Sequence, residues 1–435
     1  MKKEVKKQLV RYCTLSIISM VGISCYILAD TYFVSVGIGA TGLAALNLAI
    51  PIYSLIHGMG LMLGSGGGIR YAIQENEKQK NQIFSLSVKV GFVISSLLML
   101  LSFFGVDQIV YFLGADEVTF ALTKIYVKVL LLLSPLFIFN DIILGFLRND
   151  NAPAVAMKSM LYASFFNIVM DYILIFVFDL GMFGAVLATG LAPLVSLGGA
   201  LPHFKAQRHH FHWLFSTKLN HDIWYILSSG LPAFISEFSS GIIIIFFNLV
   251  ILNISHIAAV AAYGVVANLA LVMTSIFNGL AMGMQPLVSE AFGRKEKARI
   301  QYIYRLSTIA TIVIGVIMMI VIYVFSEPLA LVFNHEHDME MQKLAVKGLQ
   351  LYFLASPMCG FNILGITYLA ATMCDKSSQL LSALRGGVLL LPILWLLSYF
   401  LGLTGVWLSL SVSETGVMLL AIAMLYKANK NQLDY

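Results

Sequence analysis

Long apolar segments follow one another along almost the entire chain of 435 residues, with only short polar stretches between them. A helix needs about 20 mostly apolar residues to cross a roughly 30 Å hydrocarbon core. Twelve such segments can be placed along the chain, of which the first covers residues 9–34 and the last covers residues 405–426. Hydrophobic residues make up 59% of the chain and charged residues only 11%, so no room remains for a soluble domain. The sequence therefore predicts an all-α integral membrane protein with twelve transmembrane helices.

The placement of the basic residues predicts how the chain is oriented. If the N-terminus is cytoplasmic, nearly all of the 27 Lys and Arg residues fall in cytoplasmic segments, and the exceptions are Lys124, Lys128, Lys343 and Lys347. This bias predicts a multi-pass protein with both termini in the cytoplasm. The basic residues that give the chain its net charge of +5 are expected to set the topology and to contact membrane lipids. We therefore expect no nucleic-acid partner. The first segment is too long for a signal-peptide core, and we expect it to be retained.

An internal repeat divides the chain into two halves. The sequence SPLFIFN at Ser134–Asn140 returns as SPMCGFN at Ser356–Asn362, 222 residues later, and DLGMFGAVLATG pairs with FLGLTGVWLSLS at an offset of 221. Each half holds six segments, an even number, so the two repeats are parallel and substrate sites are expected near their interface. We predict a monomer with an N-lobe of helices 1–6 (residues 1–204), a cytoplasmic linker (205–222) and a C-lobe of helices 7–12 (223–435).

Acidic residues inside the membrane segments indicate where function lies, because a carboxylate at bilayer depth is costly. Five acids fall within predicted spans: Asp30, Asp141, Asp171, Glu237 and Glu414. Asn167 and Asp171 are four residues apart and share a helix face. Thr189 follows in the next segment after a short turn, and Asp30 lies at a similar predicted depth. One bundle can therefore gather two carboxylates, an amide and a hydroxyl. The only Lys and Arg residues of its three segments, Lys158 and Arg11, lie near the cytoplasmic ends of those segments.

Oxygen donors of this kind suit a proton or a small cation. Burial and mutual repulsion favour protonation of at least one of the carboxylates, which would make the group a switch. The alternative is a structural polar knot that holds helices together. Glu237 opens the second half, where it either faces a cavity as a cation or proton site or hydrogen-bonds its neighbours. Glu414 has either a paired structural role or a functional one.

Other motifs favour structural interpretations. The run GMGLMLGSGGG at Gly58–Gly68 follows no strand and precedes no Lys-Ser pair, so it predicts close helix contact rather than a phosphate loop. The lone His57 is expected to be a helix-packing residue. We expect no metal and no cofactor, because the linker histidines suggest a solvated linker and the cysteines small core residues; these residues are His209, His210, His212, Cys13, Cys25, Cys359 and Cys374.

Several of these stretches together resemble the MATE (multidrug and toxic compound extrusion) transporters, in the branch that includes DinF-like and MepA-like pumps. The resemblance covers nearly the whole chain and is carried by DTYFVSVGIGATGLAA, FNDIILGFLRNDNAPAVAM, GLPAFISEFSSG and FNGLAMGMQPLVSEAFG. It implies a two-lobed bundle in a bacterial plasma membrane. The activity it implies is a H⁺- or Na⁺-coupled antiporter that exports amphipathic, often cationic drugs by alternating access.

The resemblance also implies particular site residues. The cation or proton site would comprise Asp30, Asp141, Asn167, Asp171 and Thr189, with Asp141 at a position usually given to asparagine. A possible substrate site or second proton site would comprise Glu237, Asn140 and Tyr26. A flippase for a lipid-linked saccharide is the first rival, although its cavity would carry more Lys and Arg. An intramembrane enzyme or a channel is the second, although the spans hold no HExxH motif and no Ser-His-Asp arrangement.

Overall fold

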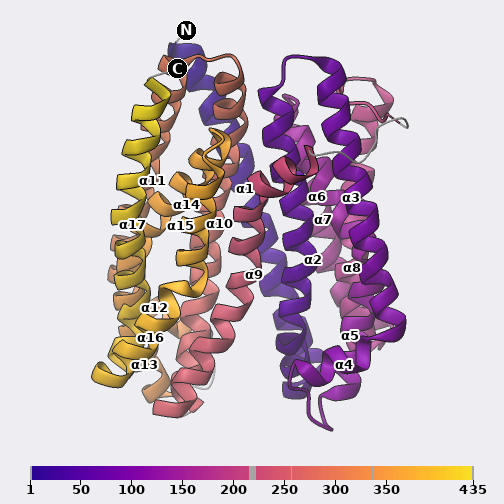
Figure 1. Ribbon diagram of the computed structural model, residues 1–435. Helices are drawn as coiled ribbons and strands as arrows, with labels where there is room; N and C mark the ends of the chain where they lie inside the picture. The colour runs from indigo at the N-terminus through magenta and orange to yellow at the C-terminus, as the bar shows by residue number, and fades with distance from the viewer. Residues whose placement is uncertain (1, 215–221, 256, 335–337, 434–435) are drawn as a thin grey trace. The chain divides into compact units, whose positions relative to one another are not determined.

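The computed structural model describes residues 2–214, 222–255, 257–334 and 338–433 (Figure 1). Within these ranges every regular element is helical: α1 (Lys2–Ile38), α2 (Ala40–Ile73), α3 (Glu77–Phe104), α4 (Val106–Phe112), α5 (Phe120–Leu132), α6 (Ser134–Asn149), α7 (Pro153–Tyr172), η1 (Ile173–Val177), α8 (Gly181–Lys205), α9 (Asp222–Ile254), α10 (Ile257–Gly293), α11 (Lys297–Val324), α12 (Ser326–Phe333), α13 (Met339–Tyr352), η2 (Phe353–Ala355), α14 (Ser356–Ala371), α15 (Asp375–Ala383), η3 (Leu384–Val388), α16 (Leu390–Leu401) and α17 (Leu403–Leu433).

The helices account for the predicted membrane spans. In the described part of the chain, 11 helical stretches are long and apolar enough to cross a membrane. The pair α5 and α6, bent by 49° at their junction, supplies a twelfth when it is counted as one span. The prediction of an all-α membrane protein with twelve transmembrane helices is therefore confirmed.

The chain packs as two compact units. The first unit is Thr14–Phe238 with Ser289–Glu296, and the second unit is Met1–Cys13, Ser239–Val288 and Lys297–Tyr435. The lobe and linker boundaries inferred from the repeat, at 204 and 222, stay a prediction. Residues 215–221 of that linker lie outside the described residues.

The sequence repeat corresponds to a repeated helix. The helices α6 and α14 each begin at the serine of a Ser-Pro pair, Ser134 and Ser356, and each has proline in its first turn. Proline is suited to this position because its missing N–H would have no partner in the first turn of a helix. The helix before each one ends at a local break, so the polar residues that follow Ser134 and Ser356 lie on helices that begin inside the membrane-spanning region.

The glycine-rich run of α2 is a surface for close helix contact. A methyl group at Gly64 would collide with the backbone of Asp141 on α6, and one at Gly145 would collide with the backbone of Gly64. A methyl group at Gly230 on α9 would likewise collide with the backbone of Met62. Only glycine allows α2 to approach α6 and the first half of α9 this closely. The close-contact interpretation of Gly58–Gly68 is therefore confirmed.

The described part of the predicted linker is exposed over most of its length, His210 and His212 included, as expected for a solvated linker, but it docks on the first unit through one buried residue, Phe211. Phe211 is only 2% exposed and packs against Phe84 and Phe146. The backbone N–H of His210 donates to Oδ2 of Asp150 at 2.8 Å. The aromatic ring between the histidines provides the apolar surface that drives this docking.

Two smaller predictions concern metal binding and the cysteines. Among the described residues no group of three His, Cys, Asp or Glu side chains is arranged to hold a metal ion. Cys359 is buried as expected for a small core residue, whereas Cys25 is exposed, so the prediction is wrong for Cys25. The exposed position is explained by the membrane, where a small apolar side chain on a helix surface can face lipid.

Candidate functional site

Helices α1 and α7 run side by side and place Asp30 opposite the acidic turn of α7. Near one end of the contact Gly22 of α1 packs against Leu161, and farther along Gly37 packs against Ile175. The residue numbers rise together along both helices, so these helices are parallel. Asp30 lies between the two glycine contacts and therefore faces the part of α7 that carries Asn167 and Asp171.

Asn167 joins α7 to α8 and holds one oxygen of the Asp171 carboxylate. With its amide oriented so that both atoms are satisfied, Nδ2 donates to Oδ2 of Asp171 at 3.2 Å and the amide oxygen accepts from the backbone N–H of Thr189 at 3.2 Å. In the opposite orientation Nδ2 donates to Oγ1 of Thr189 at 3.3 Å, but the amide oxygen then faces the carboxylate. The hydrogen-bond network favours the first orientation.

The two carboxylates are buried together without a counter-charge. Asp171 is fully buried, Asp30 is 7% exposed, and the two are close enough for their charges to interact. Each keeps a buried Oδ1 that has no hydrogen-bond partner within the described ranges. Among the ion pairs of the described residues, none involves Asp30 or Asp171. A buried charge without a partner is costly, so this pair is suited to bind a proton or a small cation.

Tyr126 belongs to the same site, although sequence reasoning missed it. It lies on α5, is 3% exposed, is hydrogen-bonded to Thr189, and lies within electrostatic reach of Asp30 and Asp171. A buried tyrosine hydroxyl normally needs a polar partner. A tyrosine within an apolar span was therefore an available signal, but its partner on α8 could not be read from the sequence.

Asp141 lies in a second cluster of the first unit and is paired with His57. His57 Nδ1 lies 2.8 Å from Asp141 Oδ2, which joins α2 to α6. The sequence interpretation of His57 as a packing residue thus missed an ionisable pair. The charge of Glu237 on α9 acts on both members of the pair. The neighbouring Asn140 is partly buried, and its Oδ1 has no hydrogen-bond partner among the described residues.

A pair of tyrosines lies between the two acidic groups. The hydroxyls of Tyr26 on α1 and Tyr53 on α2 are 2.9 Å apart. The Tyr26 hydroxyl is within electrostatic reach of Asp30, Asp141 and Glu237. The structure thus brings Glu237 and Tyr26 together with Asp141, whereas Asn167, Thr189 and Asp171 group with Asp30.

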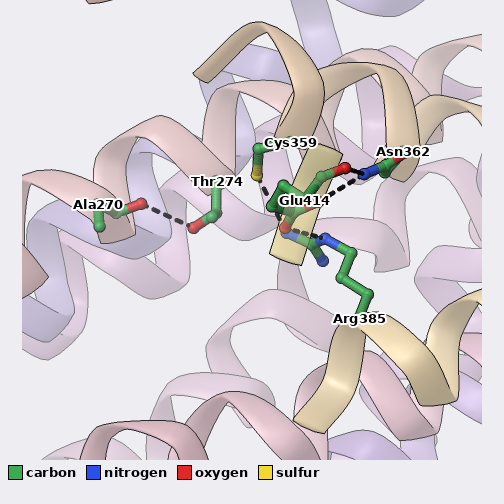
Figure 2. Close-up of polar contacts among 6 residues, drawn as sticks. All are labelled: Ala270, Thr274, Cys359, Asn362, Arg385 and Glu414. Atoms are coloured by element: carbon green, nitrogen blue, oxygen red, sulfur yellow. Dashed lines mark hydrogen bonds and ion pairs between the residues drawn. The ribbon is translucent and has the colours of Figure 1, made fainter. Parts of the chain in front are cut away.

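In the second unit, Glu414 is part of a buried ion pair (Figure 2). Nε of Arg385 donates to Oε1 of Glu414 at 2.8 Å, and Nη2 of Arg385 donates to Sγ of Cys359 at 3.1 Å. Nδ2 of Asn362 donates to Oε2 and to the backbone carbonyl of Glu414, at 2.7 and 2.8 Å. Of the two roles expected for Glu414, the structure shows the paired one.

The described helices have the fold of the solved MATE transporters. A solved multidrug resistance MATE family transporter of the MOP superfamily, in an outward-facing conformation, matches with a TM-score of 0.93 at 21% identity, over 99% of this chain and 97% of that one. A MOP superfamily transporter from Pyrococcus furiosus matches with a TM-score of 0.88 at 22% identity, over 98% of this chain and 96% of that one.

Sequence comparison identifies the family. The MatE family profile matches residues 16–173 and 232–396, so the chain belongs to the MatE family. The multidrug export protein MepA of Staphylococcus saprophyticus is 27% identical over 410 residues, covering 92% of this chain and 89% of the relative. MepA of Staphylococcus aureus is 28% identical over 407 residues, with the same coverage. The resemblance to the MATE transporters and their MepA-like branch is therefore confirmed.

Proposed function

We propose that this protein is a cation-coupled antiporter that exports amphipathic, often cationic compounds by alternating access. Its place would be a bacterial plasma membrane, with both termini in the cytoplasm. Membership of the MatE family and relatives named as multidrug export proteins support export of drug-like molecules. The observation that carries the coupling is the pair Asp30 and Asp171, buried together with no ion-pair partner among the described residues.

The pair gives two states of different charge. With both carboxylates ionised, Asp30 and Asp171 repel each other across the contact between α1 and α7. A proton or small cation removes this repulsion, because it neutralises charge that the buried site cannot otherwise balance. Asn167 holds one oxygen of Asp171 and leaves the other for the ion. An ion that binds one arrangement of the helices more tightly shifts the population toward it, and the compound would leave as the ion enters.

The test is dye efflux from vesicles that contain the purified protein, with a pH gradient or a sodium gradient imposed one at a time. We expect one of the two gradients to drive efflux in the wild type. Asp171→Asn should abolish gradient-driven efflux while the protein stays folded by size-exclusion chromatography. Asp107→Asn is the matched control, because Asp107 is 49% exposed and paired with Lys124 outside the site. Undiminished efflux by Asp171→Asn would refute the coupling scheme.

A further inference from the structure

Three helices of the first unit meet at a single imidazole. The close contact of α2 and α6 at Gly60 and Gly64 leaves no space for a side chain and brings Asp141 against α2. His57 lies one turn before Gly60, and its Nδ1 reaches Asp141 Oδ2 at 2.8 Å. Glu237 packs on α2 beside Gly58, the residue after His57. The ring of His57 is therefore placed where α2, α6 and α9 converge.

We propose that His57, Asp141 and Glu237 form a second proton-binding site, separate from the Asp30–Asp171 pair and linked to it through the hydroxyls of Tyr26 and Tyr53. Proton binding at this second site can be measured in the protein without any transport. Its part in transport rests on the function proposed above.

The charged groups around His57 determine what protonation of its imidazole does to the site. Asp141 faces it from α6 and Glu237 from α9, while Arg148 on α6 acts on it with the opposite sign. Tyr53, on the same helix, stacks on the imidazole with the ring centroids 5.8 Å apart. A protonated imidazole places a positive charge between two carboxylates. A neutral imidazole leaves those carboxylates to repel each other across α6 and α9, so the contact of α9 with the rest of the unit responds to that proton.

A line of polar groups connects this site to Asp30. Tyr26 and Asp30 are four residues apart on α1, and Tyr53 and His57 are four residues apart on α2, so each pair shares a helix face. The two tyrosine hydroxyls join these faces at 2.9 Å. Tyr26 is within electrostatic reach of acids in both sites. A change of charge at one site is therefore felt at the other, so the protonation of the two sites is electrostatically coupled.

Histidine NMR tests the site without any transport. Protein labelled at histidine is placed in lipid nanodiscs and titrated with acid, and the His57 signal is the one that His57→Gln removes. We expect Asp141→Asn and Glu237→Gln each to move the midpoint of the His57 titration by about one pH unit. The other histidines of the nine in the chain are internal controls and should not move. An unmoved His57 midpoint in both variants overturns the proposal.

Transport tests the link between the two sites. In vesicles with a pH gradient, the logarithm of the wild-type efflux rate, plotted against pH, should have the slope expected for two protons. His57→Gln retains Asp30 and Asp171 and should show a slope typical of one. An unchanged slope in His57→Gln overturns the link. If the wild type shows no ion-driven efflux, the proposed antiport fails instead, and the titration of His57 still decides whether the second site exists.

Discussion

Removing the guanidinium of Arg385 should destabilise the second unit strongly. The side chain of Arg385 is 17% exposed and that of Glu414 is 2% exposed, with Nε and Oε1 2.8 Å apart. Breaking a buried ion pair by removing one partner costs about 3 to 5 kcal/mol, because the other charge stays buried without compensation. Asn362 continues to donate to the carboxylate in Arg385→Met. We therefore expect a loss near the lower end, about 3 kcal/mol in the free energy of unfolding.

The measurement is a double-mutant cycle of reversible unfolding in mixed micelles. Glu414→Gln leaves the guanidinium without its counter-charge, although Nη2 still donates to Cys359, and should lose a similar amount, about 3 kcal/mol. The double variant, Arg385→Met with Glu414→Gln, buries neither charge and should return to within about 1 kcal/mol of the wild type.

The control is the exposed pair of Lys124 with Asp107, whose side chains are 37% and 49% exposed. Lys124→Met should cost less than about 1 kcal/mol. The reasoning is refuted if each single variant of Arg385 and Glu414 lies within about 0.5 kcal/mol of the wild type. Strictly additive losses in the double variant would refute it equally, because the two groups would then not interact.

Three further predictions follow from the first unit. Gly64→Ala should cost about 1 to 3 kcal/mol of stability because its methyl group collides with the backbone of α6, whereas Gly198→Ala, whose methyl group meets no neighbour inside a helix, should not lower the thermal midpoint. Hydrogen bonds from the side chain and backbone N–H of Thr119 hold the pKa of Asp116 below its ordinary 3.8. The backbone amides of the loop that carries Asp116 and Thr119 should therefore be protected from hydrogen exchange above about pH 4 and should lose protection as the pH falls through the lowered pKa. In Asp116→Asn this acid dependence should be absent. Tyr126→Phe should slow ion-driven efflux about fivefold, the effect of losing about 1 kcal/mol at the site; an unchanged rate would remove the tyrosine from the site.

The sequence alone determined the class, the helices and the repeat. Each of these depends on the local composition of the chain, since a run of about 20 apolar residues is stable in a bilayer only as a helix that satisfies its own backbone. The same local argument identified Asp30 and Asp171, because the cost of a buried acid depends on its depth in a span. It also predicted that the glycines of α2 allow close contact with a neighbouring helix.

Only the tertiary structure decided which buried groups are partners. His57 meets Asp141 across 84 residues of chain, and Arg385 meets Glu414 across 29. Tyr126 joins the acidic pair through a residue on another helix. The cost of burying a polar side chain predicts that it has a partner. Which residue becomes that partner depends on how helices that are distant in sequence rotate and approach each other. In this chain that approach is set by glycine contacts such as Gly64 with Gly145, whose geometry arises only when both helices are packed.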